Sequence, residues 1–222
     1  MKNFISNPYF PKKHLTTTSV AGNMKNKKIR NAFFDSLNLN SKNLVLAKQI
    51  HSSNVKIVSI LNKGTFIDNC DGLITTDKNI KIGVFTADCV PMLLFYADNI
   101  RVIKAAIHIG WKGLYNNIIE NIFDILKSKY SVKTYKVKIY IGPHICFNCY
   151  KVDYNMETKF NIKLINNKFS LSRIIYNKLK IMCVTENNIF AFDEAKYCTF
   201  HTKDLFFSYR KNHTYKRILS II

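Results

Sequence analysis

The stretch from Thr86 to Gly113 constrains the fold most, because it combines two buried-strand patterns with a short polar break. Two apolar runs, Val90 to Tyr96 and Val102 to Ile107, have the length and β-branched content of buried strands. The polar residues between them suit a tight turn. A β-hairpin is therefore the simplest interpretation of this stretch.

Each strand of the predicted hairpin is bordered by a chemically capable side chain. Cys89 directly precedes the first run and His108 directly follows the second. In an antiparallel pair these positions lie at the same end, so the sulfur and an imidazole nitrogen can meet. The segment Gly110 to Gly113 then leads into a helix predicted from Leu114 to Lys129, whose first N–H groups attract anions.

The remaining pattern predicts an α+β class with mixed sheets in one domain, residues 1–222. The chain is long enough to bury a core and shows no internal repeat or linker. The other predicted helices are Ile29–Leu37, Asn155–Phe160 and Ser170–Met182. The other predicted strands are an edge strand in His14–Val20, then Leu44–Ile50, Val55–Leu61, Cys70–Thr75, Ile80–Thr86, Val137–Ile141, Ile189–Phe192, Leu205–Tyr209 and Ile218–Ile222.

The net charge of +20 suggests nucleic acid as a partner, but the distribution of charge argues against it. Nearly all of the positive charge is lysine, scattered among asparagine and isoleucine, whereas nucleic-acid surfaces favour arginine. No apolar run approaches the roughly 18 to 20 residues of a membrane span, and no signal-peptide pattern is present. We expect a cytoplasmic protein without nucleic-acid or membrane partners, whose basic surface is compatible with phosphate binding.

The six cysteines are expected to be reduced thiols, since no secretion signal accompanies them. Cys146 and Cys149 form a C-x-x-C motif, but no second such pair completes a structural zinc site. The simplest interpretation of this motif is a pair of small buried side chains near a turn.

Three residues at predicted strand ends could form a metal site. His51 follows the strand predicted to end at Ile50, and Cys89 and His108 flank the hairpin. A His-Cys-His set with an open fourth position would suit a catalytic metal that lowers the pKa of a bound water. The alternatives are a Cys89 nucleophile with a histidine base, oriented by Asp88, or ordinary core and surface residues.

Four neighbouring residues admit a functional and a plain structural role. Asp88 could orient a base or cap a turn, and Trp111 could be a ligand platform or a packing plug. Lys112, near a predicted helix N-terminus, could bind phosphate or be merely solvated. Arg210, at the end of a predicted strand, could bind substrate or lie on the surface.

Taken in order, the motifs QIHSSNV, TADCVPMLL, IHIGWKGL, IGPHICFNCYKV, the late CT and FFSYRKNHTYKR resemble those of the laccase-domain family. That family is known as multicopper polyphenol oxidases and also as purine nucleoside phosphorylases, and the resemblance covers about residues 27–222. It implies a mixed β-sandwich flanked by helices. It also implies one zinc ion per chain, bound by His51, Cys89 and His108, which would be catalytic through the metal.

The resemblance further implies the reaction. The family's activity would be phosphorolysis of adenosine, inosine, guanosine and methylthioadenosine, with adenosine deamination as a side activity. The partners would be a purine nucleoside and phosphate, in a monomer or homodimer. We infer substrate-binding roles for Lys112, Arg210 and Asp88 from their positions beside these motifs.

Some residues depart from the family pattern. The usual G-W-R-G is G-W-K-G at Lys112, the N-terminal T-R-x-G-G segment matches poorly, and Lys216 replaces the glycine before the final arginine. These departures put substrate choice in doubt. The alternatives are a cysteine hydrolase or peptidoglycan-precursor editing factor that uses Cys89, or a copper-dependent polyphenol oxidase. The last needs about ten histidine and cysteine ligands, whereas this chain has six histidines.

Overall fold

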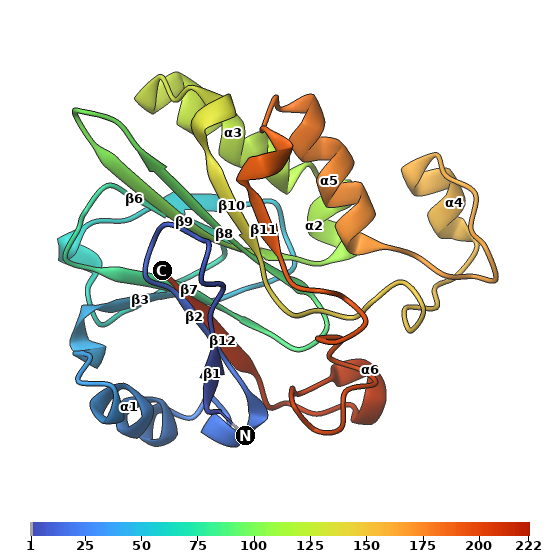
Figure 1. The fold of residues 1–222 in the computed structure, drawn as a ribbon, viewed down its shortest axis with the longest axis horizontal. Coiled ribbons are helices and arrows are strands. Elements are labelled where there is room, and N and C mark those ends of the chain that lie inside the picture. The colour runs from blue at the N-terminus through green and yellow to red at the C-terminus, as the bar shows by residue number, and fades with distance from the viewer. Residues whose placement is uncertain (1) are drawn as a thin grey trace.

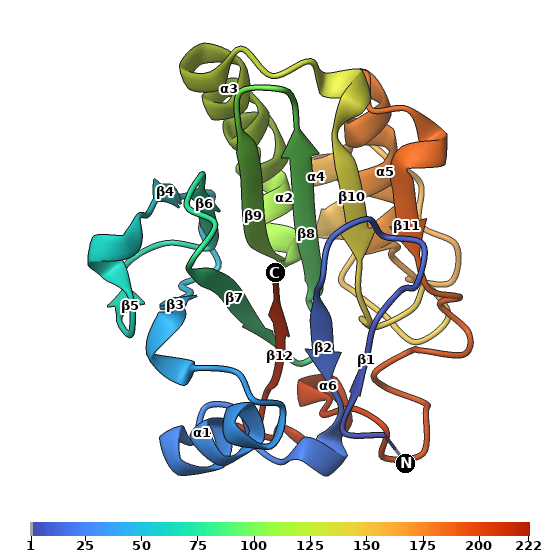
Figure 2. The ribbon, with the colours of Figure 1, turned by 60° about the vertical axis from the view of Figure 1, so that its left-hand side comes forward.

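The computed structural model describes residues 2–222, which form two six-stranded mixed sheets with helices on their outer faces (Figures 1 and 2). The first sheet has the order β1 (Phe4–Ile5), β2 (Leu15–Thr17), β12 (Ile218–Ile221), β7 (Lys81–Thr86), β3 (Leu44–Ala47) and β5 (Phe66–Ile67). The second has the order β11 (Ile189–Ala191), β10 (Lys138–Ile141), β8 (Val90–Ala97), β9 (Val102–Ile109), β6 (Gly72–Thr75) and β4 (Val55–Ile57). The α-helices are α1 (Lys27–Ser36), α2 (Trp111–Tyr115), α3 (Ile118–Tyr130), α4 (Asn155–Phe160), α5 (Leu171–Ile181) and α6 (Tyr209–Asn212).

The two sheets face each other across a shared apolar core. Val45 and Val84 of the first sheet meet Leu93, Ala106 and Tyr140 of the second in one buried cluster. The opposite face of each sheet is also covered, which explains why the central strands are apolar at almost every position. The α+β class with a mixed β-sandwich flanked by helices is thus confirmed.

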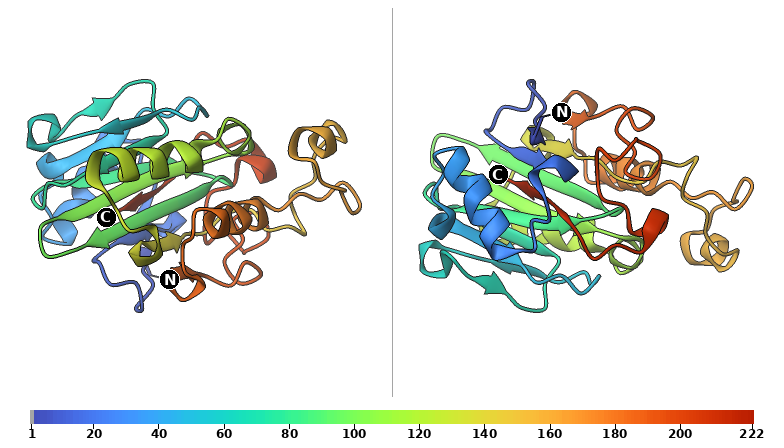
Figure 3. Two further views of the ribbon diagram at one scale, coloured as in Figure 1. Left: turned by 90° about the horizontal axis from the view of Figure 1, so that it is seen from above. Right: turned by 90° about the horizontal axis from the view of Figure 1, so that it is seen from below.

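Helices cover the two outer faces separately (Figure 3). Helix α1 contributes Phe33 and Phe34 to a cluster with Leu46, Phe85 and Leu219 on the outer face of the first sheet. Helices α3 and α5 pack their apolar stripes against the outer face of the second sheet. The molecule is therefore layered as helix, sheet, sheet and helices.

The hairpin predicted from the central stretch is confirmed as β8 and β9. Its ladder pairs Leu93 with Ala106 and Pro91 with His108. His108 lies inside β9 rather than after it, because the strand continues to Ile109. Cys89 directly precedes β8, so the two side chains do reach the same end of the hairpin.

Two predictions are wrong in detail. The single helix predicted from Leu114 to Lys129 is two helices, α2 and α3, because Asn117 adopts a left-handed conformation with φ 64°. The strand predicted from Leu205 to Tyr209 is absent from the described chain, and Ser208 instead caps helix α6. Helix α5 begins after Ser170, whose hydroxyl accepts from the backbone N–H of Arg173.

Several other elements begin or end within a few residues of their predicted bounds. The strand expected from Leu44 to Ile50 ends at Ala47, and the one expected from Val55 to Leu61 ends at Ile57. Within residues 2–222, no helix is both long enough and apolar enough to cross a membrane.

Candidate metal centre and its cleft

His51, Cys89 and His108 converge although they come from three separate segments. His51 lies in the loop after β3 with φ 60°, Cys89 precedes β8, and His108 lies in β9. One nitrogen or sulfur donor atom from each lies within 4.8 Å of the others. The Sγ atom of Cys89 is 3.9 Å from Nε2 of His51, and the two imidazole rings stand almost perpendicular, with centroids 4.7 Å apart.

The expectation that His51 terminates a strand is corrected here, because three residues separate it from the end of β3. Asp71, which sequence reasoning passed over, holds it in place. Oδ1 of this buried carboxylate accepts the backbone N–H of His51 at 3.0 Å, and Oδ2 accepts the backbone N–H of Ser52 at 2.7 Å. These bonds compensate for the left-handed conformation of His51, which is uncommon for a residue other than glycine.

The same carboxylate orients His108. Nδ1 of His108 donates to Oδ1 of Asp71 at 2.7 Å. Because a carboxylate only accepts here, Nδ1 carries a proton, and in the neutral imidazole the lone pair of Nε2 faces Cys89 and His51. A carboxylate behind a histidine ligand is a common feature of metal sites, since it fixes the tautomer and the ring orientation.

Without a metal, the neighbouring charges favour a thiolate on Cys89 and an imidazolium on His108. Burial opposes ionisation of Cys89, but the charge and hydrogen bonds of His108 and His51 outweigh it and lower the pKa of Cys89 to about 6. Burial likewise disfavours the charged form of His108, but the Cys89 thiolate and Asp71 raise its pKa to about 9. For Asp71, burial is outweighed by hydrogen bonds and charge from His108 and by Ser52, so its pKa is lowered. Each group stabilises the charged state of its neighbour.

The backbone at Gly110 closes tightly over this cluster. A Cβ atom at that position would lie 3.1 Å from Sγ of Cys89 and 3.2 Å from Cδ2 of His51. Gly110 has φ −97°, which any residue can adopt, so glycine is required by the close approach and not by the backbone conformation.

Asp88 is buried beside the cluster with φ 90°, and both of its carboxylate oxygens have protein donors. Oδ1 accepts the hydroxyl of Thr199 at 2.7 Å, and Oδ2 accepts the backbone N–H of Arg210 at 2.6 Å. Asp88 therefore links the loop before β8 to two distant C-terminal segments. Its predicted contact with substrate stays a prediction.

A cleft of about 640 Å³ opens over the three donors. Its walls carry five aromatic side chains and four cationic ones beside the candidate metal ligands. The aromatic residues are Phe66, Phe85, Trp111, Tyr150 and Tyr209. The cationic residues are Lys25, Lys48, Arg210 and Arg217.

The two basic residues predicted to bind substrate lie differently with respect to this cleft. Arg210 lines it, and its guanidinium lies 5.0 Å from the ring centroid of Tyr150 and donates to the carbonyl of Lys151 at 2.6 Å. Lys112 is exposed and is not among the lining residues, and its Nζ lies 5.7 Å from the Trp111 ring centroid. A substrate role for Lys112 stays a prediction.

The donor set fits a transition metal. One thiolate and two imidazoles, converging from rigid positions with room for a fourth ligand on the cleft side, suit zinc in a catalytic type of site. The carboxylate of Asp71 behind His108 completes the usual outer arrangement.

This fold and this cluster define an α+β protein with a cleft over a candidate transition-metal site. The chain belongs to the family described as "Multi-copper polyphenol oxidoreductase laccase", whose sequence model matches residues 6–222. The family suspected from the motifs is therefore confirmed, and the match also includes the N-terminal segment that resembled it poorly.

Individual relatives support the same assignment. The chain is 31% identical over 183 residues to "Purine nucleoside phosphorylase Cj1217c" of Campylobacter jejuni, covering 80% of this chain and 76% of that protein. It is 29% identical over 123 residues to "Adenosine deaminase RL5" from an unknown prokaryotic organism, covering 52% and 46% respectively. The crystal structure of YlmD from Geobacillus stearothermophilus superposes with a TM-score of 0.88 at 19% identity, covering 99% of this chain and 95% of that one. This last likeness concerns the fold alone.

Proposed function

We propose that the protein is a zinc-dependent purine nucleoside phosphorylase acting on adenosine, inosine, guanosine and methylthioadenosine. The observation that carries the proposal is the composition of the cleft, which places aromatic walls and four cations beside His51, Cys89 and His108. The relative named as a purine nucleoside phosphorylase supports it. We assign the whole activity to one domain, and the apolar cluster that the two sheets share supports this assignment.

The aromatic walls suit a purine base. Flat apolar rings such as those of Trp111 and Tyr150 stack on a base, and the cleft volume is in the usual range of about 300 to 1,000 Å³ for small-molecule sites. The nucleoside would lie with its base against these rings and its ribose toward the three metal ligands.

The cationic side of the cleft suits phosphate. Burial lowers the pKa of Lys25, and the nearby charge of Arg217 lowers it further. Two like charges this close repel each other, and an anion bound between them relieves the repulsion. Phosphate would therefore bind near Lys25 and Arg217, and Arg210 would add a third contact at the rim.

In the proposed reaction a phosphate oxygen bonds to the anomeric carbon of the ribose as the bond from that carbon to the purine breaks. The purine leaves with the bonding electron pair and takes a proton. Zinc, when bound, supplies Lewis-acid chemistry and water activation at the cleft. The chain itself orients the site, because Asp71 keeps the Nδ1 proton on His108 and leaves Nε2 directed at the ligand cluster.

Adenosine deamination is a second candidate activity, because a relative that matches half of this chain is named an adenosine deaminase. Water would replace the exocyclic amino group of the base and release ammonia. A cysteine hydrolase is favoured by a different observation, the lowered pKa of Cys89 without metal. Copper-dependent phenol oxidation has less support, since this cluster offers three ligands and not the larger set of a multicopper oxidase.

The decisive experiment incubates zinc-loaded protein with adenosine or inosine, with and without phosphate. We expect free purine and ribose phosphate only when phosphate is present, and ammonia release would report deamination separately. Cys89→Ser should lose the activity, whereas Cys183→Ser, which changes an exposed cysteine outside the cleft, should keep it. Release of purine without phosphate would exclude a phosphorylase. Full activity in metal-free protein with a covalent adduct on Cys89 would favour the hydrolase.

A further inference from the structure

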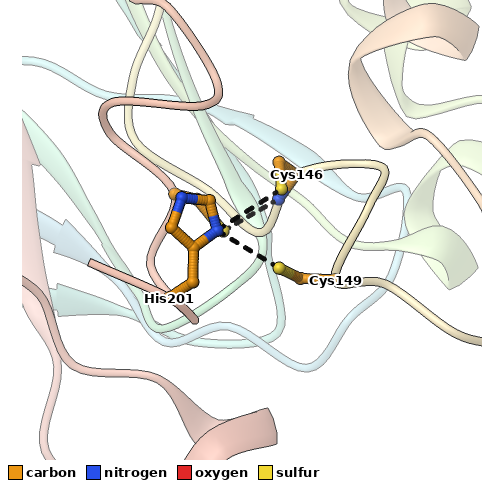
Figure 4. Close-up of side chains that lie close together, drawn as sticks. Cys146, Cys149 and His201 are labelled. Carbon is orange, nitrogen blue, oxygen red and sulfur yellow. Dashed lines mark hydrogen bonds between the residues drawn. The ribbon is translucent and has the colours of Figure 1, made fainter. Parts of the chain in front are cut away.

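A second group of metal-binding side chains lies outside the cleft and is not used by the proposed reaction. It consists of Cys146, Cys149, Cys198 and His201, whose donor atoms all lie within 4.8 Å of one another. The first two occupy the turn after β10, and the other two lie in the segment before α6. Figure 4 shows the imidazole of His201 directed at the sulfur atoms of Cys146 and Cys149. The C-x-x-C motif therefore has two potential partners in a distant segment, beyond its interpretation as two small side chains near a turn.

The donor atoms are spaced almost as they are in a tetrahedral zinc site. Nδ1 of His201 is 3.2 Å from Sγ of Cys149 and 3.8 Å from Sγ of Cys146. In a tetrahedral zinc site with Zn–S bonds of about 2.3 Å and Zn–N bonds of about 2.0 Å, the ligand atoms are separated by roughly 3.5 to 3.8 Å. Donor atoms within 4.8 Å of one another need to move by only about 1 Å or less to reach that geometry.

The protein fixes His201 in the form that binds a metal. Nε2 of His201 lies 2.7 Å from the backbone carbonyl of Ala195. A carbonyl can only accept, so Nε2 carries the proton and the lone pair of Nδ1 faces the cysteines. A backbone carbonyl behind a ligating histidine is one of the usual outer partners at metal sites.

The cysteines are also positioned as ligands. The backbone N–H of Cys146 donates to Sγ of Cys198 at 3.3 Å, an interaction that stabilises negative charge on the sulfur. Each ligand pair is spaced by two residues in a tight turn, since Cys149 N–H donates to the Cys146 carbonyl and Thr202 N–H donates to the Cys198 carbonyl. Two such turns, each presenting two ligands, are the usual construction of a structural zinc site.

We propose that Cys146, Cys149, Cys198 and His201 bind a second zinc ion in a closed, tetrahedral, structural site. Three thiolates and one imidazole select zinc by ligand softness and geometry, and four protein ligands leave no position for water or substrate. This site is thereby distinct from the His51, Cys89 and His108 cluster, which has three protein ligands and opens on the cleft.

The second zinc would brace one wall of the cleft. Thr199, next to Cys198, donates to Oδ1 of Asp88 at 2.7 Å, and Tyr150, next to Cys149, lines the cleft. The four ligands join two segments about fifty residues apart, neither of which has regular secondary structure at the ligands. A metal that crosslinks them holds both Tyr150 and the Thr199 contact in place.

The test measures metal content, so it does not depend on the proposed activity. Reduced wild-type protein should bind two zinc ions per chain, and Cys89→Ser should bind one. His201→Ala and Cys149→Ser should also bind one, because they remove an exposed and a half-buried ligand without opening the core. Combining Cys89→Ser with His201→Ala should abolish binding, and Cys183→Ser should still bind two. One zinc ion in the wild type that is lost in Cys89→Ser, or unchanged zinc content in His201→Ala, would overturn the proposal.

A spectroscopic measurement on Cys89→Ser tests the second site even if the variants of its own ligands fail to fold. X-ray absorption at the zinc edge of Cys89→Ser should show three sulfur neighbours at about 2.3 Å and one nitrogen. Reconstitution of the same metal-free variant with Co²⁺ should give the thiolate charge-transfer absorption of a tetrahedral site. A zinc shell of nitrogen and oxygen only, copper in place of zinc, or a metal-free Cys146–Cys149 disulfide in freshly reduced protein would each contradict the assignment.

Discussion

Asp71 and His108 lie 2.7 Å apart, measured from the carboxylate Oδ1 to the imidazole Nδ1, at the junction of strands β6 and β9. The backbone N–H of His108 also donates to the carbonyl of Asp71 at 2.8 Å. Since the same carboxylate accepts from the backbone of His51, one residue positions two of the three candidate zinc ligands. The metal cluster is therefore fixed by the sheet and does not depend on the loops alone.

Replacing Asp71 by asparagine should weaken zinc binding at the cleft by about 10- to 100-fold. Asparagine keeps the volume but removes the charge that holds the Nδ1 proton of His108, and it offers one acceptor oxygen fewer to the loop of His51 and Ser52. Competition with a chelator measures the affinity. Asp68→Asn, which changes an exposed carboxylate paired with Lys48, is the matched control and should leave the affinity unchanged. Equal affinity in Asp71→Asn and wild type would contradict the role given to Asp71.

The stability contributed by Asp71 should depend on pH in a defined direction. Its pKa is lowered in the folded state, so its contribution is present above the unfolded value of about 3.9 and is lost as pH falls through the folded value. The difference in free energy of unfolding between wild type and Asp71→Asn, measured in urea on metal-free protein, should shrink as pH falls from about 5 toward 2. A difference that grows in acid would show the opposite sign of coupling.

Cys89 in metal-free protein should react as a thiolate well below neutral pH. Its alkylation rate should rise with pH around a midpoint near 6, because His108 and His51 stabilise the thiolate. His108→Asn removes the main cation and should move the midpoint upward toward the free-thiol value of about 8.5. Mass spectrometry of the modified peptide, in a Cys183→Ser background that removes an exposed competing thiol, gives the rate. An unchanged midpoint in His108→Asn would show that the charge of His108 does not lower the pKa of Cys89. Bound zinc should protect Cys89 from the alkylating reagent.

The hairpin and the ligand triad could be predicted from the sequence for separate reasons. The hairpin followed from two apolar runs around a polar turn, whose buried faces leave little freedom of register. The triad followed chiefly from motif resemblance, because spacing alone left a nucleophile and plain core residues open. Asp71 carries no local signal, since its role arises only when β6 pairs with β9.

The misses have physical causes of the same kind. Apolar spacing is continuous from Leu114 to Lys129, and only the left-handed backbone of Asn117 divides the helix. The apolar residues Leu205 and Phe206 are typical of a strand. In the structure they lie in a bend before the capped helix α6, and Phe206 is buried there. The cluster of Cys146, Cys149, Cys198 and His201 could not be predicted from local pattern, because its two halves lie about fifty residues apart in the sequence. The spacing of Cys198 and His201, with two residues between them, was nevertheless a visible signal of a second ligand pair.

Lys25→Met should raise the KM for phosphate by about tenfold and leave the KM for the nucleoside nearly unchanged. Lys25 and Arg217 are the close cationic pair of the cleft, and a hydrogen bond to a charged group is worth about 1.5 to 3 kcal/mol. Lys27→Met, which removes a nearby exposed lysine outside the cleft, is the control for net charge. Equal effects of the two substitutions would place phosphate elsewhere.

Gly110→Ala should weaken zinc binding in the cleft without unfolding the protein. The backbone of Gly110 has φ −97° and ψ 173°, which alanine adopts freely, so the fold should lose less than about 1 kcal/mol at this helix N-cap. The new Cβ, however, would lie 3.1 Å from Sγ of Cys89 and 3.2 Å from Cδ2 of His51, closer than such atoms normally approach. Both ligands must then move by a few tenths of an ångström.

A ligand shift of that size matters because metal sites tolerate little displacement, so the zinc affinity of Gly110→Ala should fall by about tenfold. Chelator competition in a His201→Ala background isolates the cleft site from the proposed second zinc, and urea unfolding of the metal-free protein checks the fold. Unchanged affinity would mean that His51 and Cys89 are not held against Gly110 when they bind the metal. If the free energy of unfolding of the metal-free variant falls by as much as its free energy of zinc binding, the substitution acts on the fold. The close contact acts on the ligands alone only if the metal-free variant is as stable as the wild type.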